Sequence, residues 1–494
     1  MIFFMHQLTK RSVDYSKWYN EIIIKSGLAE FSGIRGFMII KPYGFSIWEI
    51  IKNTLDKMFK ETGHKNVYFP MLIPKSSFSK EKKHIENFSR ECAIVTHCKL
   101  KKNTDQEELT VDPKSKLQEE LVIRPTSESI IWKTFRHWIH SYRDLPLLLN
   151  QWGNAIRWEM RTRLFLRTSE FLWQEGHTAH STEKEAIEET KKILNIYTDF
   201  SEKVMAIPVV QGIKPYMDKF SGSETTFSLE AMMQDGKALQ IGTSHFLGQN
   251  FSKAFDVKFT NKNGKKEYVW STSWGVSTRL IGGIVMLHSD DHGLILPPKI
   301  APIQIVIIPI YKNQKELSKI NEIAERIQKI IKEKGFTVKY DNREIFTPGW
   351  KFHEYEMKGI PIRINIGLDE ILKEKAEVFR RDTYEKVDVS WNQIITFIPK
   401  LLDKIQKNLY QRALNRTKKL TMISDHYEDF KKKIKRCRRF YSCSLGWNKK
   451  YRKKIQEETE ATIRCIPIST KKKGGKCIYS GNHSSQRVVF AKSY

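Results

Sequence analysis

An arginine, a threonine and a glutamate stand close together in "IRPTSES", residues 123–129, directly after the strand-like run "ELVI". Proline and serine in such a stretch favour a loop. Held together by that loop, Arg124, Thr126 and Glu128 could contact a small polar molecule. A structural alternative exists, because "PTSES" also has the pattern of a helix N-cap followed by an acidic first turn.

Two arginine-centred motifs lie further along the chain. In "NAIRWEMRTRLFLRTSEF", Arg157 and Glu159 are followed by Arg167 and Phe171. In "SWGVSTRLIGG", Arg279 follows a run of small residues that predicts a strand passing into a helix. The planar guanidinium of arginine binds carboxylates and phosphates through two donors at once. Both motifs therefore indicate a site for anionic groups.

The elements that must position these residues follow from the hydrophobic pattern. Residues 46–63 predict an amphipathic helix that Gly63 ends, and "VYFP" predicts the strand after it. "GLILPPKIAP" predicts a linker, because consecutive prolines interrupt helices and sheets. Beyond it, "IQIVIIPI", "KELSKINEIAERIQKIIKEKG", "FTVKYD" and "IPIRINIG" predict an α/β unit. We expect an α+β domain at 1–298, an α/β domain at 299–405 and a small α+β C-terminal domain at 406–494.

Composition limits the class of protein. A hydrophobic fraction of 40% over 494 residues is typical of a globular, multidomain chain. The net charge of +29 favours a polyanionic partner such as nucleic acid, although AT-rich coding would also enrich lysine. No apolar run reaches the roughly 20 residues that span a bilayer. We therefore expect a cytoplasmic protein without a membrane partner.

The motifs, taken in order, resemble a known family. A helix, a strand and Pro70, then the Arg157–Phe171 motif, then the Arg279 motif resemble motifs 1, 2 and 3 of the class II aminoacyl-tRNA synthetases. "RPTSE", "FLRTSEFLWQEGHTAHST", "ALQIGTSHFLGQNF" and "SWGVSTR" together resemble the prolyl-tRNA synthetases of the archaeal/eukaryotic-type branch (type 3). The resemblance spans nearly the whole chain. It implies an antiparallel catalytic sheet flanked by helices, an α/β anticodon-binding domain and a C-terminal extension.

The implied reaction joins L-proline to tRNA(Pro) through prolyl-adenylate. Its first step is attack of the amino-acid carboxylate on the α-phosphate of ATP, which needs positioning and fixed positive charge more than a protein nucleophile. By resemblance, Arg157 and Arg279 are the catalytic residues, and Mg²⁺ bridges the phosphates. The residues implied for ATP are Arg157, Glu159, Arg167, Thr168, Phe171, Gln240, Ser277 and Arg279.

The resemblance also implies a proline pocket in which Glu128 and Thr126 receive the cationic secondary amine. The implied residues are Thr126, Glu128, Arg157, Trp173, Glu175, His177, Thr243 and His245. Without the family, the two histidines would be ordinary core or surface residues and Trp173 a core residue. The combination in family order favours the substrate-binding interpretation.

Two features of tRNA handling are also expected. About a hundred residues separate Phe171 from Arg279, and most of them match the core pattern, which leaves no room for the large editing domain that many bacterial-type relatives insert. We therefore expect no hydrolysis of Ala-tRNA(Pro) in cis. The candidates for anticodon contact are Arg363, Arg380 and Arg381, with an ion-paired structural face as the alternative.

The C-terminal domain of the family often binds zinc through four cysteines. The cysteines here are Cys437, Cys443, Cys465 and Cys477, whose spacing is looser than the two to four residues usual for tight thiolate pairs. A Zn²⁺ site and a metal-free module with reduced cysteines both remain open. The ending "FAKSY" implies that Tyr494 turns toward the active site, and the motif 1 helix implies an isologous homodimer.

Two other functions fit part of the pattern. A ligase that serves a carrier or a small molecule would keep the adenylation motifs, but the anticodon-like domain and the high charge argue against it. An inactive RNA-binding paralogue would keep the charge, but the presence of Arg157, Arg279, Thr126 and Glu128 argues against it.

Overall fold

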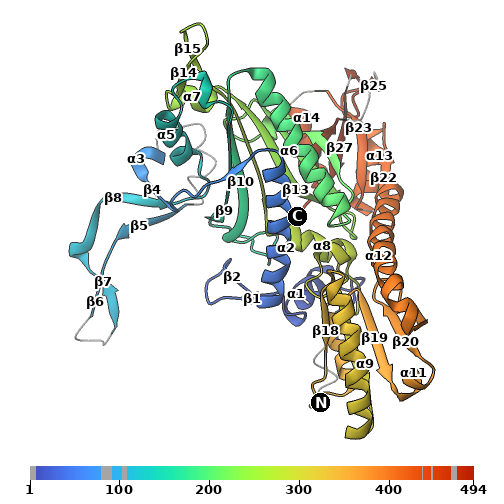
Figure 1. Cartoon of the computed structure of the whole chain (residues 1–494). Helices are drawn as coiled ribbons and strands as arrows, with labels where there is room; N and C mark the ends of the chain where they lie inside the picture. The colour runs from blue at the N-terminus through green and yellow to red at the C-terminus, as the bar shows by residue number, and fades with distance from the viewer. Residues whose placement is uncertain are drawn as a thin grey trace.

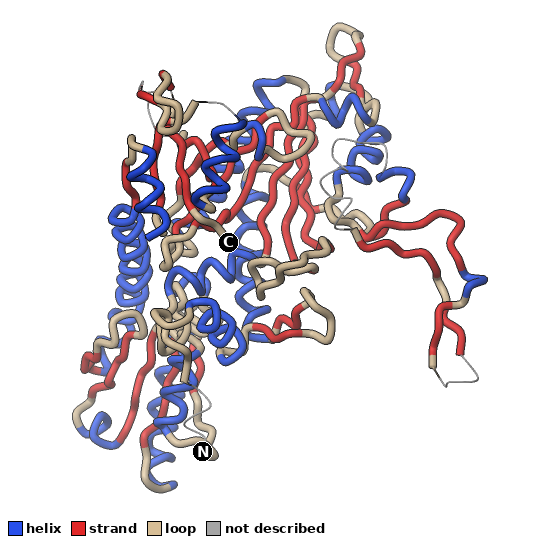
Figure 2. The backbone as a smooth tube through the Cα atoms, turned by 180° about the vertical axis from the view of Figure 1, so that it is seen from behind, coloured by secondary structure: helices blue, strands red, loops and turns tan. Residues whose placement is uncertain are grey.

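The computed structural model describes residues 7–78, 92–102, 108–436, 438–446, 449–468, 475–484 and 486–494. Strands from the N-terminal and the C-terminal regions of the described chain join in one large sheet (Figures 1 and 2). The pairs β22–β23 and β3–β9 are parallel and the other neighbours are antiparallel, which confirms the predicted architecture. Across the sheet the order is β22 (Thr421–Ile423), β23 (Phe440–Ser444), β27 (Arg487–Ala491), β24 (Thr462–Pro467), β11 (Val210–Ile213), β12 (Thr225–Met232), β13 (Ala238–Gly248), β16 (Trp270–Ser277), β10 (Glu170–His180), β9 (Leu147–Ile156) and β3 (Lys65–Asn66).

Helix α2 (Pro42–Glu61) matches the predicted amphipathic helix. Proline suits its first position because the N–H it lacks would have no partner there. Ile51, Leu55 and Phe59 are buried at helical spacing, and the Phe59 ring lies 4.8 Å from that of Trp274 in the sheet. Gly63, at φ +88°, provides the left-handed turn that follows the helix.

The strand predicted at "VYFP" is wrong. The pairing strand is β3 at Lys65–Asn66, and residues 67–70 form a connection. The backbone N–H of Phe69 donates to the Gln151 side chain, and Pro70 has no N–H, so neither can extend the ladder.

Helix α6 (Glu183–Lys203) covers one face of the central strands (Figure 1). A capping box between Thr182 and Glu185 starts it, which satisfies backbone N–H groups on both sides. Its Tyr197 donates a hydrogen bond to the Gln174 amide oxygen of β10 at 2.5 Å. Helix α1 (Tyr15–Lys25), the hairpin β1 (Ala29–Phe31)–β2 (Met38–Ile40) and α8 (Arg279–His288) complete this core.

An arm of strands projects away from the body in both views (Figures 1 and 2). Its strand β8 ends at Ile123, and α5 (Glu128–Trp138) begins five residues later, so "IRPTSES" is the strand-to-helix turn. Near α5 lie the short helix α7 (Asn250–Ala254) and the hairpin formed by β14 (Lys258–Thr260) and β15 (Lys266–Tyr268). The other elements of this part are β4 (Leu72–Pro74), α3 (Lys75–Phe78), β5 (Ala93–His97), β6 (Leu100–Lys102), β7 (Leu109–Val111) and β8 (Lys116–Ile123).

The α/β domain has the predicted strand–helix–strand core. Its strand order is β18-β17-β19-β20-β21, with β17 parallel to both β18 and β19. An Asn313 N-cap begins the first helix, and apolar residues at helical spacing bury one face of it. The elements are β17 (Ile305–Ile310), α9 (Gln314–Glu333), β18 (Val338–Tyr340), α10 (Pro348–Met357), β19 (Ile362–Gly367), α11 (Leu368–Leu372), β20 (Lys375–Arg380) and β21 (Lys386–Ser390).

The C-terminal region packs around its own hydrophobic cluster and is continuous with the rest of the protein. Helix α12 (Trp391–Leu420) runs through the predicted boundary at 405, because apolar residues at helical spacing continue on both sides of it. Ile405 packs in the core of the α/β domain, whereas Ala413 packs in that of the catalytic body. Strand β24 pairs with β11, so the C-terminal strands extend the catalytic sheet. The other elements are α13 (Tyr427–Arg436), α14 (Lys449–Thr459), β25 (Gly475–Lys476) and β26 (His483–Ser484).

Among the described residues, none of the helices combines the length and apolar character needed to cross a lipid bilayer.

Candidate active site

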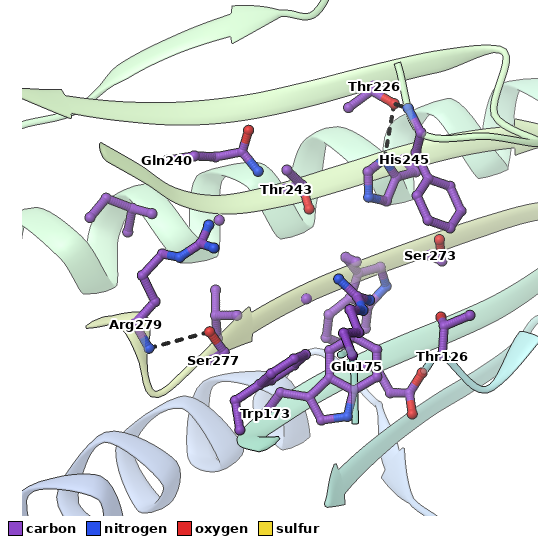
Figure 3. A pocket seen from close by; sticks show the side chains of 18 of the residues that line it. Thr126, Trp173, Glu175, Thr226, Gln240, Thr243, His245, Ser273, Ser277 and Arg279 are labelled. Atoms are coloured by element: carbon purple, nitrogen blue, oxygen red, sulfur yellow. Dashed lines mark hydrogen bonds between the residues drawn. The ribbon is translucent and has the colours of Figure 1, made fainter. Parts of the chain in front are cut away.

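A cavity of about 480 Å³ opens on the face of β10, β16 and β13 that lies opposite α6 (Figure 3). Every residue predicted for proline or ATP lines it, although these residues are spread over more than 150 positions of the chain. They are Thr126, Glu128, Arg157, Glu159, Arg167, Thr168, Phe171, Trp173, Glu175, His177, Gln240, Thr243, His245, Ser277 and Arg279.

Strand register creates the floor of the cavity. Glu175 and Thr243 both pair with Gly275, which lies between them in the sheet. His177 and His245 both pair with Ser273 in the next row. Side chains two apart on a strand point to the same face, so these rows bring the residues to one side.

A β-bulge places Gln240 on the same face. Gln240 and Thr243 are three residues apart, so regular alternation would point them to opposite faces. Leu229 pairs with Gly242 and Glu230 with Gln240, which leaves Ile241 as the extra residue. Such a bulge re-aims the side chains beside it. Figure 3 shows Gln240 on the cavity side with Thr243.

At one end of the cavity, Thr126 donates a hydrogen bond to the carboxylate of Glu128. Glu128 is the first residue of α5, where backbone N–H groups favour a negative charge, and it is only 3% exposed. Glu128 is therefore both the acidic first residue of α5 and a residue of the cavity wall.

The carboxylate of Glu175 has three internal partners. Ser127 Oγ donates to it at 2.5 Å, Gln151 Nε2 donates at 2.7 Å, and His177 Nε2 lies 3.0 Å away. Glu175 therefore fixes His177 and the "RPTSE" turn.

Arg157 links the two sequence motifs. Its Nε donates to the Pro125 carbonyl at 2.9 Å. Its guanidinium carbon lies 5.4 Å from the Phe171 ring centroid and 5.5 Å from that of Trp173. The aromatic rings thus hold a cation between the two ends of the cavity.

Positive charge gathers at the other end, where Figure 3 shows Arg279, Ser277 and Gln240. Arg279 Nε donates to the Leu166 carbonyl at 3.2 Å. Burial and the nearby Arg167 and Arg157 lower the pKa of Arg279 to about 10, so it stays charged at neutral pH. This end is suited to a polyanion.

Arg167 has two neighbours at this end. Its Nη1 lies 3.7 Å from Glu159 Oε2, and its Nη2 donates to the Tyr494 backbone oxygen at 3.1 Å. Tyr494 therefore reaches the motif 2 arginine, as the chain ending implied.

Cavity residues that no sequence motif had predicted include Thr226, Phe220, Ser273 and Lys214. Thr226 Oγ1 lies 3.0 Å from His245 Nδ1, and Phe220 stacks on the His245 ring at 4.6 Å. Ser273 could have been found from strand alternation with Ser277. Phe220 comes from a connection without periodicity, so no sequence pattern indicated it.

The three arginines predicted to contact the anticodon are buried. Arg363 is ion-paired with Glu356 at 3.1 Å, and its guanidinium carbon lies 3.9 Å from the Phe352 ring centroid. The side chains of the other two, Arg380 and Arg381, form ion pairs at 2.9 Å with Asp382 and at 2.7 Å with Asp290, respectively. These contacts favour the ion-paired alternative, because a buried guanidinium that is paired with a carboxylate has fewer donors available to RNA.

The described residues do not bring the predicted zinc-binding cysteines together in one group of three. Cys437 lies outside the described residues. Cys443 pairs with Val488 of β27 and Cys465 with Val489, so these two thiols point to opposite faces of the sheet. Burial raises the pKa of both thiols to about 12. Within the described parts, no group of three or more metal-ligating side chains is present.

Comparisons with known proteins place these observations in a family. Residues 109–288 match the class II tRNA synthetase core domain of the G, H, P, S and T group, residues 304–401 an anticodon-binding domain, and residues 427–494 the C-terminal domain of prolyl-tRNA synthetase. The chain is 54% identical to the proline–tRNA ligase of Porphyromonas gingivalis, with 99% of each chain covered. It belongs to the prolyl-tRNA synthetases. A Flavobacterium psychrophilum proline–tRNA ligase is 55% identical, again with 99% of each chain covered.

A solved structure agrees with this family assignment. The prolyl-tRNA synthetase of Cryptosporidium parvum, crystallised with halofuginone and AMPPNP, superposes with a TM-score of 0.92. It is 36% identical, with 99% of this chain and 97% of that chain covered. The likeness therefore extends over nearly the whole chain.

Proposed function

We propose that this prolyl-tRNA synthetase forms prolyl-adenylate and transfers the prolyl group to the 3′ end of tRNA(Pro) in the cavity between Glu128 and Arg279. The supporting observation is the convergence of all the predicted substrate residues on one sheet face, with a carboxylate at one end and arginines at the other. This polarity matches a substrate pair made of a cationic amine and a polyphosphate.

Proline binds at the Glu128 end in this proposal. Its secondary ammonium lies against Glu128 and Thr126, and its ring lies among Trp173, His177 and Phe220. Its carboxylate then points toward Arg157, which the Pro125 carbonyl and the aromatic rings hold in place. That orientation aims the nucleophilic oxygen at the arginine end.

ATP binds at the Arg279 end. Its adenine stacks between Phe171 and Arg279, Glu159 accepts from the adenine amine, and Gln240, Thr168 and Ser277 complete the nucleotide contacts. Arg157, Arg167 and Arg279 stabilise the charge that develops on the α-phosphate oxygens while pyrophosphate leaves. Mg²⁺ enters with ATP and is bound mainly by phosphate oxygens. No protein nucleophile is required, because the proline carboxylate attacks directly.

Editing in cis is absent in this proposal, in keeping with the archaeal/eukaryotic-type branch. The chain between β10 and β16 forms α6, β11, β12, β13, α7, β14 and β15, which pack on or extend the core. Alanine lacks the ring contacts and is rejected by only about 1–3 kcal/mol. The pure protein is expected to activate alanine weakly and to leave Ala-tRNA(Pro) intact; rapid hydrolysis would contradict this.

A different surface of the α/β domain is suited to the anticodon. The rings of Phe346 and Trp350 stack with centroids 3.8 Å apart, and the Arg343 guanidinium lies 4.8 Å from the first. Neighbouring Ile345 is 84% exposed. Arg343 is itself ion-paired with Asp341 and Glu354, so we assign base stacking to the two rings alone, and the Phe346–Trp350 pair replaces the buried arginines as our candidate.

We further propose that the protein acts in the cytoplasm as an isologous homodimer. Exposed apolar residues support a second copy as partner, since Phe31, Ile34, Ile39 and Phe45 lie beside or on α2 at 42–60% exposure. Sedimentation equilibrium of the pure protein tests this, and a monomer at micromolar concentration would exclude it.

The deciding experiment is ATP–pyrophosphate exchange with each of the twenty amino acids, followed by aminoacylation of tRNA(Pro). We expect strong exchange with proline, weak exchange with alanine, and proline-specific charging. Exchange with no amino acid would refute the proposal and favour the RNA-binding paralogue.

A further inference from the structure

Arg464 connects the C-terminal region to the interior of the catalytic sheet. It belongs to β24, yet its Nε and Nη2 lie 3.0 and 2.9 Å from Glu230 Oε2 in β12. The Glu230 side chain is completely buried and that of Arg464 is 13% exposed. An ion pair this enclosed requires donors for both carboxylate oxygens.

The second donor is Lys214, which lines the cavity. Its Nζ lies 2.6 Å from Glu230 Oε1 and also donates to the Arg464 carbonyl at 2.8 Å. Each oxygen of Glu230 therefore has a cation, and Lys214 contacts both other members. The three residues form one closed network.

Two bulges aim this network at the nucleotide end. In β24, Ile463 and Cys465 pair with consecutive residues of β27, which leaves Arg464 as the extra residue. In the second bulge, between β12 and β13, Glu230 pairs with Gln240 beside the extra residue Ile241. Bulges re-aim side chains near active sites, and these two direct a carboxylate and a guanidinium to one point.

The backbone and the side chain of Lys214 have different partners. Its backbone N–H donates to the Thr226 carbonyl, and Thr226 contacts His245 at the proline end. Its ammonium reaches Glu230, the strand partner of Gln240 at the ATP end. Displacement of the ammonium would therefore alter the ATP end, while the backbone bond at the proline end would remain.

Charge balance also assigns a role to Glu230. Arg157, Arg167 and Arg279 gather at the ATP end before any phosphate arrives. Burial, Arg167, Arg157 and Arg464 lower the pKa of Arg279, and Glu230 acts in the opposite direction. A fixed, buried carboxylate therefore offsets part of the repulsion among the cations.

We propose that Arg464, Glu230 and Lys214 are positioning residues through which the C-terminal region fixes the ATP end of the active site. This inference rests on the proposed function of the cavity. In this proposal the carboxylates at the proline end, Glu128 and Glu175, belong to α5 and β10, whereas the network belongs to β12, β24 and the connection after β11. The network therefore governs the affinity for ATP, separately from that for proline.

The test is Arg464→Met, which keeps an unbranched apolar stem and removes the charge and the donors of the guanidinium. In proline-dependent ATP–pyrophosphate exchange, KM for ATP should rise about tenfold, as expected for a residue that orients a binding group, with KM for proline within about twofold. Arg464→Lys should recover most of the loss. The matched control is Arg487→Met, which removes the same group from the adjacent strand β27, where it pairs with Asp425 at 2.7 Å.

An unchanged KM for ATP in Arg464→Met would overturn the inference, as would equal rises in both KM values. If Arg464→Met does not fold, Lys214→Met is measured instead, because it leaves the Arg464–Glu230 pair intact. A similar rise in KM for ATP supports the network, and wild-type behaviour overturns it. Absence of exchange in the wild-type protein would defeat the proposed function itself, which separates the two failures.

Discussion

Substitution of Glu128 by glutamine removes one charge from the proline end and keeps the shape of the side chain. Glu128 is 3% exposed and stands at the start of α5, whose N-terminal N–H groups carry partial positive charge. Without the carboxylate, these groups and the ammonium of proline repel each other. Removal of one partner from a buried charge pair costs about 3–5 kcal/mol, which corresponds to about 10²–10⁴-fold in kcat/KM. We expect the lower half of this range, because the cavity opens to solvent.

The assay is pyrophosphate exchange with proline varied at saturating ATP. In Glu128→Gln, kcat/KM for proline should fall at least about 10²-fold, while KM for ATP stays within about twofold. The matched control is Glu120→Gln, which removes a surface carboxylate that pairs with Lys75 at 2.6 Å. It should leave both constants unchanged.

An amine-free analogue isolates the charge. In tetrahydrofuran-2-carboxylate, an ether oxygen replaces the amine, so its inhibition constant should not worsen in Glu128→Gln. If the variant weakens this analogue as much as proline, or if proline loses less than about tenfold, Glu128 is not the counter-charge for the amine.

Three further outcomes are expected. Arg279→Lys should lower kcat about 10²-fold, because lysine cannot replace a fixed guanidinium at the phosphate, and a wild-type kcat would exclude that role. Trp350→Ala should lower kcat/KM for tRNA about 5- to 150-fold, which corresponds to about 1–3 kcal/mol, and leave pyrophosphate exchange intact; equal aminoacylation would remove the stacked cluster as the anticodon contact. Burial would raise the pKa of Asp290, but hydrogen bonds from Arg381 and Tyr384 hold it at about 2. The ordinary value is 3.8, so about 2 kcal/mol of folding free energy, present above pH 4, should be lost as pH falls toward 2. Asp290→Asn should flatten this acid dependence in denaturant titrations, and an unchanged slope would contradict the assignment.

Much of the site could be predicted from the sequence because short motifs carry their own geometry. "RPTSE" follows a strand and opens a helix, so Thr126 and Glu128 meet within one turn. In "FLWQEGH", alternation along one strand places Phe171, Trp173 and Glu175 on the same face. Local spacing is sufficient where one element holds the whole group.

The buried arginines show where local spacing fails. Arg380 and Arg381 occupy a basic stretch that is indistinguishable in sequence from an RNA-binding surface. Their partners include Asp290, which lies 91 residues away in the catalytic body. Only tertiary packing brings that carboxylate to Arg381, and the same limit applies to the cysteines, whose faces depend on strand pairing with β27.

The sequence by itself determined the family, the motifs and the chemical nature of the two cavity ends, because these depend on residue type and on short spacing. The tertiary structure alone decided which strands are neighbours and where they bulge. The bulge at Ile241 turns Gln240 toward the cavity, and the bulge at Arg464 turns a C-terminal guanidinium toward Glu230. A bulge is set by the register between two strands, and register depends on pairing energies across the whole sheet that no single segment contains.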